Sequence, residues 1–274
     1  MSVTITASDI NKLRQATGAG MLDCRKALTE SNGDFEAAID WLRKQGQKVA
    51  AKRSDREAKE GVILAKTTAD NKAGIIVCIS CETDFVSKNA DFVAFAQSIA
   101  DAAITNNVKS AEELNEVIIN GAKVSDMIND KLAAIGEKIA LSKFERVEAP
   151  FVASYIHGAN RMGVLVGMSV EAADAGKDVA MQIAAMNPIA VDESFVSAEL
   201  IAREKEIAIE QIKAEGKPAE MAEKIAMGKL NKFFKDNTLL AQAFVKDGNK
   251  SVADYLKSID ADLKVTEFKR IALG

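Results

Sequence analysis

One seventeen-residue pattern occurs twice in this chain, and the duplication restricts the possible folds more than any other feature. Residues 61–77 and 150–166 align without a gap, and each has an apolar run, a short polar turn and a second apolar run. The match continues through the second runs, where Gly, Val, Ser and Glu coincide between residues 74–82 and 163–171. Apolar runs joined by a polar turn predict a β-hairpin in each copy.

Helical patterns follow both hairpins, over residues 86–103 and 178–185. Two further helices are expected between the copies, over residues 111–119 and 124–139. A hairpin with one apolar face must cover that face with another element. The duplication therefore predicts an α+β core with antiparallel sheets, each covered on one face by helices.

The first 56 residues carry three short helical patterns separated by glycine-containing turns, which predict a small three-helix bundle. Ser8 or Asp9 is expected to begin the first helix, and Gly46 is expected to end the third. In the second helix, the residues expected to face inward are Leu22, Ala27 and Leu28.

Two charged, alanine-rich helical segments interrupt the second copy between residues 197 and 235. Gly216 and Pro218 stand between them, and these residue types favour a helix end followed by a helix start. A partial apolar stripe on each segment is enough to pair them, so the pattern predicts an antiparallel helical hairpin. We expect this hairpin to project as an interaction arm; packing against the body is the alternative.

These patterns together predict three parts. The N-terminal three-helix domain spans residues 1–56, and the core divides into an N-subdomain, 57–149, and a C-subdomain, 150–274. The helical hairpin, 197–235, is an insertion in the C-subdomain.

The tetrapeptide Thr83-Asp84-Phe85-Val86 stands where an apolar strand ends and a helical pattern begins. Thr or Asp at such a corner is expected to cap the new helix by accepting a backbone N–H bond. Phe85 follows the cap directly, in the first turn. Two interpretations fit this position: the ring packs beneath the helix as core, or it stays uncovered and acts as a wedge against a partner.

Charge and motif content favour a protein that acts by binding. The net charge is −4, which argues against a broad basic surface for nucleic acid, and the basic stretch over residues 44–59 is expected to be a solvated helix end and linker. No phosphate-binding loop, nucleophile elbow or His-Glu-x-x-His pair occurs, and His157 is the only histidine. We therefore expect no catalytic group, no metal site and no cofactor.

Cys78 and Cys81 have the spacing of a dithiol or metal site. Residues three apart on a strand point to opposite faces, so the pair is not expected to share a ligand. A thiol oxidoreductase is therefore the third hypothesis, after the two described below. The odd number of cysteines, the absence of a secretory pattern at the N-terminus and the lack of a bilayer-length apolar run predict a cytoplasmic protein without a membrane partner.

Four motifs, in order along the chain, closely resemble the bacterial translation elongation factor Ts family. They are LRQATGAGMLDCRKAL at residues 13–28, Thr83-Asp84-Phe85-Val86, Tyr155-Ile156-His157-Gly158 and Gly216-Lys217-Pro218. The resemblance extends from about Ser8 to Phe268. Each motif alone is weak, but the ordered set is highly specific.

This resemblance implies a guanine-nucleotide exchange factor, not an enzyme, that binds elongation factor Tu in its GDP-bound and nucleotide-free states and promotes GDP release. It also implies that the N-terminal bundle is like a ubiquitin-associated (UBA) domain. In the family, the Asp-Phe pair, carried here by Asp84 and Phe85, pushes between helices of the GTPase and disturbs the Mg²⁺ side of its site. The other contact positions implied by the resemblance are Thr83, Val86, His157, Ile135, Gly136, Leu22 and Arg25.

Other possibilities stay open at the level of sequence. The alternative function is a UBA-type adaptor that binds ubiquitin-like or peptide partners without affecting nucleotide exchange. The chain stops at residues 268–274, so the additional C-terminal module of longer family members is not expected. A homodimer or a two-plus-two assembly, through the cores or the helical hairpins, also fits.

Overall fold

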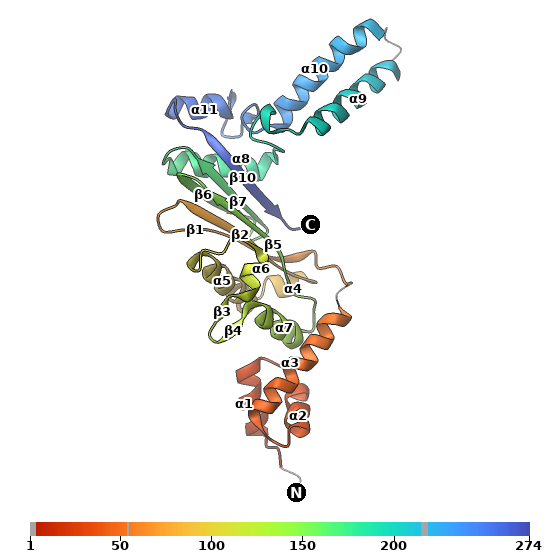
Figure 1. Ribbon diagram of the computed structural model, residues 1–274, viewed down its shortest axis with the longest axis vertical. Coiled ribbons are helices and arrows are strands. Elements are labelled where there is room, and N and C mark those ends of the chain that lie inside the picture. The colour runs from red at the N-terminus through yellow and green to blue at the C-terminus, as the bar shows by residue number, and fades with distance from the viewer. Residues whose placement is uncertain (1–3, 54, 215–218) are drawn as a thin grey trace.

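The protein is an elongated molecule with helices at both ends and β-sheet in the middle (Figure 1). The computed structural model describes residues 4–53, 55–214 and 219–274. At one end lies a bundle of α1 (Ala7–Thr17), α2 (Met21–Glu30) and α3 (Phe35–Lys52). At the other end α9 (Ala198–Ala214) and α10 (Ala219–Asn237) lie side by side and extend away from the body.

The first sheet has the strand order β1-β2-β5, with both pairs antiparallel. Its strands are β1 (Glu60–Thr67), β2 (Ala73–Cys81) and β5 (Ala140–Glu148). One face packs against α5 (Ala90–Thr105) and α7 (Val124–Ile135), with Ile75, Val77 and Ile79 of β2 in the shared core. The short elements between these helices are α6 (Ala111–Glu116), β3 (Ile118–Ile119) and β4 (Ala122–Lys123).

The second sheet repeats this arrangement with the order β10-β7-β6, again antiparallel. Its strands are β6 (Phe151–His157), β7 (Met162–Met168) and β10 (Val265–Ala272). Helix α8 (Ala173–Met186) covers one face, with Val179 and Ile183 in the core. The remaining elements are η1 (Glu193–Phe195), β8 (Ala243–Phe244), β9 (Asp247–Ser251) and α11 (Val252–Ile259).

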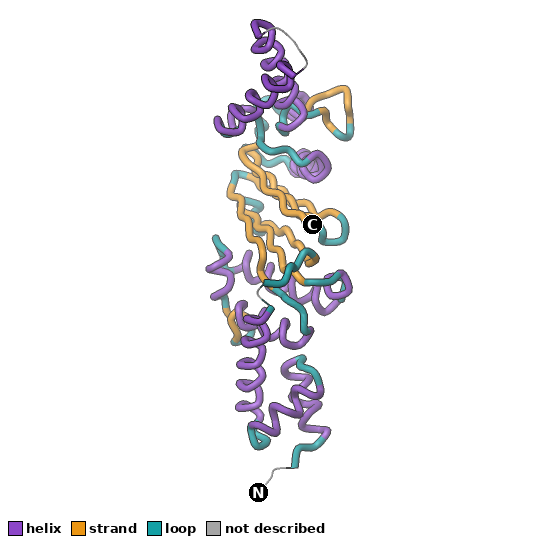
Figure 2. The backbone as a smooth tube through the Cα atoms, turned by 90° about the vertical axis from the view of Figure 1, so that its right-hand side faces the viewer, coloured by secondary structure: helices purple, strands orange, loops and turns teal. Residues whose placement is uncertain are grey.

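The two sheets pack on each other through the faces that no helix covers. Ile63 and Ile76 of the first sheet share a buried cluster with Val152 and Leu165 of the second. Figure 2 shows the strands of both sheets together in the middle of the molecule, with helices beyond them on either side. The α+β class, the antiparallel pairing and the helix cover on one face are confirmed, whereas the contact between the sheets was not anticipated.

The glycine shared by the two sequence copies has a packing role at this contact. A Cβ atom added at Gly74 would lie 2.8 Å from Leu165 Cδ2 and 2.9 Å from Val152 Cγ1. A Cβ atom at Gly163 would lie 2.9 Å from Ile63 Cγ2. Each copy therefore places a glycine where a side chain of the other sheet needs the space.

Two expected helix boundaries in the bundle were wrong. Helix α1 is capped by Thr6, whose hydroxyl accepts from the Asp9 N–H in a reciprocal capping box, so Asp9 lies in the first turn instead of starting the helix. Helix α3 continues through Gly46 to Lys52. Gly46 does not end the helix because it lies against α7, where its Cβ would be 3.0 Å from the Ala133 Cβ.

The helix expected over residues 86–103 is two helices, α4 (Asp84–Ser87) and α5. The chain breaks between them because Asn89 caps α5 by accepting from the N–H groups of Asp91 and Phe92. Helix α7 stops at Ile135, and Gly136, with φ of 80°, forms its left-handed C-cap. Residues 118–119, expected at a helix end, form β3 instead.

The α9 and α10 pair is held by a short apolar seam. Ile212 and Ala226 are buried between the helices, with Ile225 packed beside them. Ala208 is buried in the same seam, and Ile207, expected there, is 37% exposed and lines a small cavity with Leu230 and Phe233 of α10. Gly216 and Pro218, expected to separate the helices, lie outside the described residues.

We predict that Gly163→Ala lowers the free energy of unfolding by about 1–3 kcal/mol, the usual effect of overpacking a core. The added methyl group must displace Ile63 or the opposing sheet. Gly228→Ala is the matched control, because nothing lies within 4 Å of a Cβ there in α10; we expect it to stabilise the protein by up to about 1 kcal/mol. Urea unfolding of both variants checks this, and equal effects would contradict it.

Candidate functional site

The corner, defined as Thr83-Asp84-Phe85-Val86, connects the buried strand β2 to helix α4. Thr83 has an extended backbone, with φ of −122° and ψ of 155°, and its side chain does not cap the helix. Its N–H donates to Glu137 Oε2 at 3.0 Å, and its hydroxyl donates to Glu137 Oε1 at 2.7 Å. The expected helix cap was therefore wrong, because a carboxylate on a neighbouring loop binds both Thr83 donors.

Phe85 is 85% exposed, so the interpretation of its ring as ordinary core was wrong. Asp84 precedes it and forms an ion pair of 2.6 Å with Lys88, one turn along the chain. The hydrogen bond from Lys88, followed by its positive charge, lowers the pKa of Asp84. The corner thus presents an ionised carboxylate and an uncovered aromatic ring side by side.

A groove of about 600 Å³ lies beside the corner, between α5, α7 and the α1–α2 turn. Phe85, Val86 and Ile135 all line it, so the structure brings together three of the residues expected at the site. Its floor includes Phe92 and Phe95, and the Lys131 Nζ atom lies 4.9 Å from the centre of the Phe95 ring. Gly136, directly after Ile135, ends α7 at the rim.

His157 lies outside that groove, at the exposed end of β6. Its Nδ1 atom is 3.0 Å from the Tyr155 hydroxyl. The adjacent turn reaches the edge of the first sheet, where Arg161 forms a 2.7 Å ion pair with Glu60. The hydrogen bond and charge of Glu60 raise the pKa of Arg161, and the charge of Asp84 adds to this effect, so the turn after His157 lies within electrostatic range of the corner.

Leu22 and Arg25 are exposed on α2 and do not line the groove. Leu22 is 80% exposed, so its expected inward orientation was wrong, whereas Ala27 and Leu28 are buried as expected. The α1–α2 turn brings the bundle to the groove through Thr17 and Gly18 instead.

Comparison with known proteins identifies the family. A family model described as elongation factor Ts matches residues 82–274. The chain belongs to the elongation factor Ts family. The proteins named elongation factor Ts from Flavobacterium psychrophilum and Christiangramia forsetii are 53% and 51% identical to it, covering 99% and 98% of this chain and 99% of each relative. The relative from Clostridium perfringens is 44% identical and covers 98% of this chain and 93% of its own length.

The resemblance inferred from the four motifs is therefore confirmed. Members of the elongation factor Ts family are guanine-nucleotide exchange factors of translation elongation, and this chain has that role with elongation factor Tu as its partner. The adaptor alternative is not favoured, because the relatives match the core as well as the bundle. Within the described residues, none of the helices combines the length and apolarity that crossing a membrane requires.

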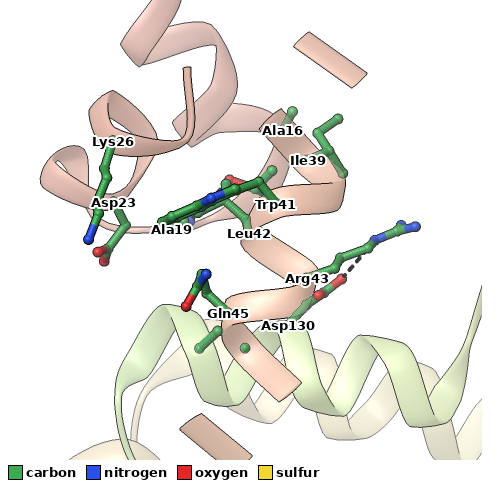
Figure 3. A pocket seen from close by; sticks show the side chains of 13 residues that line it. Ala16, Ala19, Asp23, Lys26, Ile39, Trp41, Leu42, Arg43, Gln45 and Asp130 are labelled. Carbon is green, nitrogen blue, oxygen red and sulfur yellow. Dashed lines mark hydrogen bonds and ion pairs between the residues drawn. The ribbon is translucent and has the colours of Figure 1, made fainter. Parts of the chain in front are cut away.

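A second cavity, of about 370 Å³, lies between the bundle and α7 (Figure 3). Trp41 and Lys26 line it, with the Lys26 Nζ atom 5.7 Å from the centre of the indole ring. Arg43 and Asp130 meet at 3.8 Å on its other side. Burial raises the pKa of Asp130, against the charge of Arg43. The cavity contains no residue expected at the site and marks the junction between bundle and core.

Sequence reasoning missed the carboxylates that hold the corner. Glu82 accepts from the backbone N–H of Lys138 at 2.6 Å and pairs with Arg56 at 3.1 Å and Arg53 at 3.4 Å. The Lys138 N–H bond, followed by the Arg56 hydrogen bond, lowers the pKa of Glu82. The charge pattern had suggested that Arg53 and Arg56 are solvated, but both pair with Glu82. One feature of the sequence could have drawn attention to Glu82: both sequence copies have a glutamate at this position.

Cys78 and Cys81 point to opposite faces of β2, as expected from strand alternation. Cys78 is buried between the sheets, and Cys81 is buried beneath the helices. Burial raises the pKa of Cys78, and burial followed by the charge of Glu137 raises the pKa of Cys81 to about 12. In the described part of the chain, no three His, Cys, Asp or Glu side chains are grouped to hold a metal.

We predict that Phe85→Ala changes the free energy of unfolding by less than about 0.5 kcal/mol, as is usual at exposed positions. Phe92→Ala, the same substitution at a residue that is 1% exposed, should cost about 3–5 kcal/mol. Chemical unfolding of the two variants measures the difference. A large loss at position 85 would mean that the ring is packed in solution.

We also predict that the three cysteines of the folded protein resist a thiol reagent such as Ellman's reagent at pH 8. A folded-state pKa above the usual value keeps a thiol protonated, and the thiolate is the reactive form. All three should react after denaturation. Rapid labelling of the native protein would revive the oxidoreductase hypothesis.

Proposed function

We propose that this protein releases GDP from elongation factor Tu by inserting Phe85, with Asp84 beside it, between helices of the GTPase. The observation that carries the proposal is the 85% exposure of the Phe85 ring at a corner held by hydrogen bonds. Transferring such a ring from water into a protein pocket contributes about 1.5–3 kcal/mol. That free energy is available in the complex and is not used in the free protein.

Exchange of this kind needs no catalytic group on the factor. GDP binding by a GTPase depends on Mg²⁺ and on backbone donors around the phosphates. If the Asp84-Phe85 wedge fits the nucleotide-free GTPase better than the GDP-bound form, it must weaken GDP binding by the same factor. The proposed insertion would do this by disturbing the Mg²⁺ and phosphate side of the nucleotide site.

The remaining contact residues extend this surface. Ile135 and Gly136 at the end of α7 border the groove that Phe85 and Val86 line, and Thr83 fixes the start of α4. His157 adds an exposed imidazole from the second sheet. Leu22 and Arg25, both exposed on α2, provide a separate contact to the nucleotide domain of the GTPase.

The proposal assigns a role to each part of the chain. Residues 1–56 form a UBA-like domain, residues 57–149 and 150–274 form the two core subdomains, and residues 197–235 form a projecting interaction arm. Separate hydrophobic clusters in the bundle and beneath each sheet support this division. We further propose action in the cytoplasm without direct nucleic-acid contact, and pairing as a homodimer or a two-plus-two assembly.

Release of fluorescent GDP from elongation factor Tu tests this proposal. Phe85→Ala should reduce the stimulated release rate at least about tenfold, because the loss of a buried aromatic contact exceeds 1.4 kcal/mol. Ile118→Ala is the control: it removes another exposed apolar side chain, 67% exposed, on the β3–β4 hairpin that precedes the opposite end of α7. Equal rates for wild type and Phe85→Ala would refute the wedge.

A further inference from the structure

Helix α4, which carries the wedge, has little internal support. It is four residues long, none of its residues is buried, and the side chain of its N-cap residue, Thr83, accepts no hydrogen bond from the helix backbone. Val86 packs partly against the first core, which restrains one side of the turn. A ring that is 85% exposed has no packing of its own to fix its direction, so the backbone before it must do so.

Glu137 supplies that restraint from a separate element. It follows Gly136, whose N–H donates to Leu132 O at 2.8 Å and whose left-handed backbone ends α7. The Glu137 carboxylate then accepts both donors of Thr83, at 3.0 Å and 2.7 Å. Two bonds to one ionised group fix orientation as well as position and are stronger than bonds between neutral groups. These bonds join Thr83 to a residue 54 positions away in the sequence.

We infer that Glu137 is a positioning residue for nucleotide exchange: it acts through Thr83 to hold the Phe85 ring in the direction that enters the GTPase. This inference rests on the proposed function of Phe85. Glu137 is not assigned a contact with the partner. Its contribution is pre-organisation, because a side chain already fixed in its binding direction loses less entropy in the complex.

A double-mutant cycle separates positioning from a general structural effect. In the wild-type background, Glu137→Ala should lower kcat/KM for stimulated GDP release about tenfold, which corresponds to about 1.4 kcal/mol. In the Phe85→Ala background the same substitution should have less than about a twofold effect, because no ring remains to be positioned. Glu137→Gln retains one acceptor oxygen and should lose less activity than Glu137→Ala.

Glu113→Ala is the matched control. Glu113 Oε2 also accepts a backbone N–H, from Lys109 at 2.8 Å, but it lies on α6 and not beside the corner. We expect this variant to keep wild-type exchange activity. Amide hydrogen exchange at Thr83, measured by NMR on the free protein, adds a readout independent of the partner and should accelerate in Glu137→Ala but not in Glu113→Ala.

The outcomes distinguish the two levels of the proposal. Full activity of Phe85→Ala overturns the wedge and the positioning role together. Impaired Phe85→Ala with fully active Glu137→Ala overturns the positioning role alone. The positioning role is also overturned if Glu137→Ala lowers kcat/KM equally in both backgrounds, or if amide hydrogen exchange at Thr83 is unchanged. The inference is supported if Glu137→Ala lowers stimulated GDP release only in the background that retains Phe85 and also accelerates amide hydrogen exchange at Thr83.

Discussion

The close contact between the two sheets is the constraint on which the rest of the structure depends. Gly74 and Gly163 each leave room for a side chain of the opposite sheet, so the two copies of the hairpin can pack face to face. This packing brings the turn after β6 to the edge where β1 begins, and the Ile63 N–H donates to Asn160 O at 2.8 Å there. Because Glu60 pairs with Cys81 at that edge, the corner and the His157 end of β6 come to the same region from different subdomains.

At the corner, the backbone before Phe85 is held in place, whereas the Phe85 ring is exposed to solvent. β2 is buried along its whole length, and carboxylates hold the residues that follow it. Phe85 is left in water at the end of this support, where an ordinary core phenylalanine would be covered. In the proposed function, this uncovered ring weakens GDP binding because it favours the nucleotide-free state of the GTPase.

Much of the fold could be predicted from periodicity alone. The paired apolar runs predicted both hairpins, and alternation correctly separated Cys78 from Cys81. The third strand of each sheet was missed, because β5 and β10 are mostly half-exposed and carry charged residues, so their apolar patterns are weak. Gly46 was wrongly expected to end α3, because a glycine in the sequence fits a helix end and a close contact between helices equally well.

The sequence by itself determined the family, the duplicated antiparallel core and the position of the Asp84-Phe85 pair after a buried strand. It did so because hydrophobic periodicity and ordered motifs are local properties of the chain. Only the tertiary structure decided that Phe85 is exposed, that Leu22 faces outward and that Thr83 binds Glu137 instead of capping its helix. Those outcomes depend on which neighbour occupies the space around each side chain, and the neighbours come from distant segments brought together by packing.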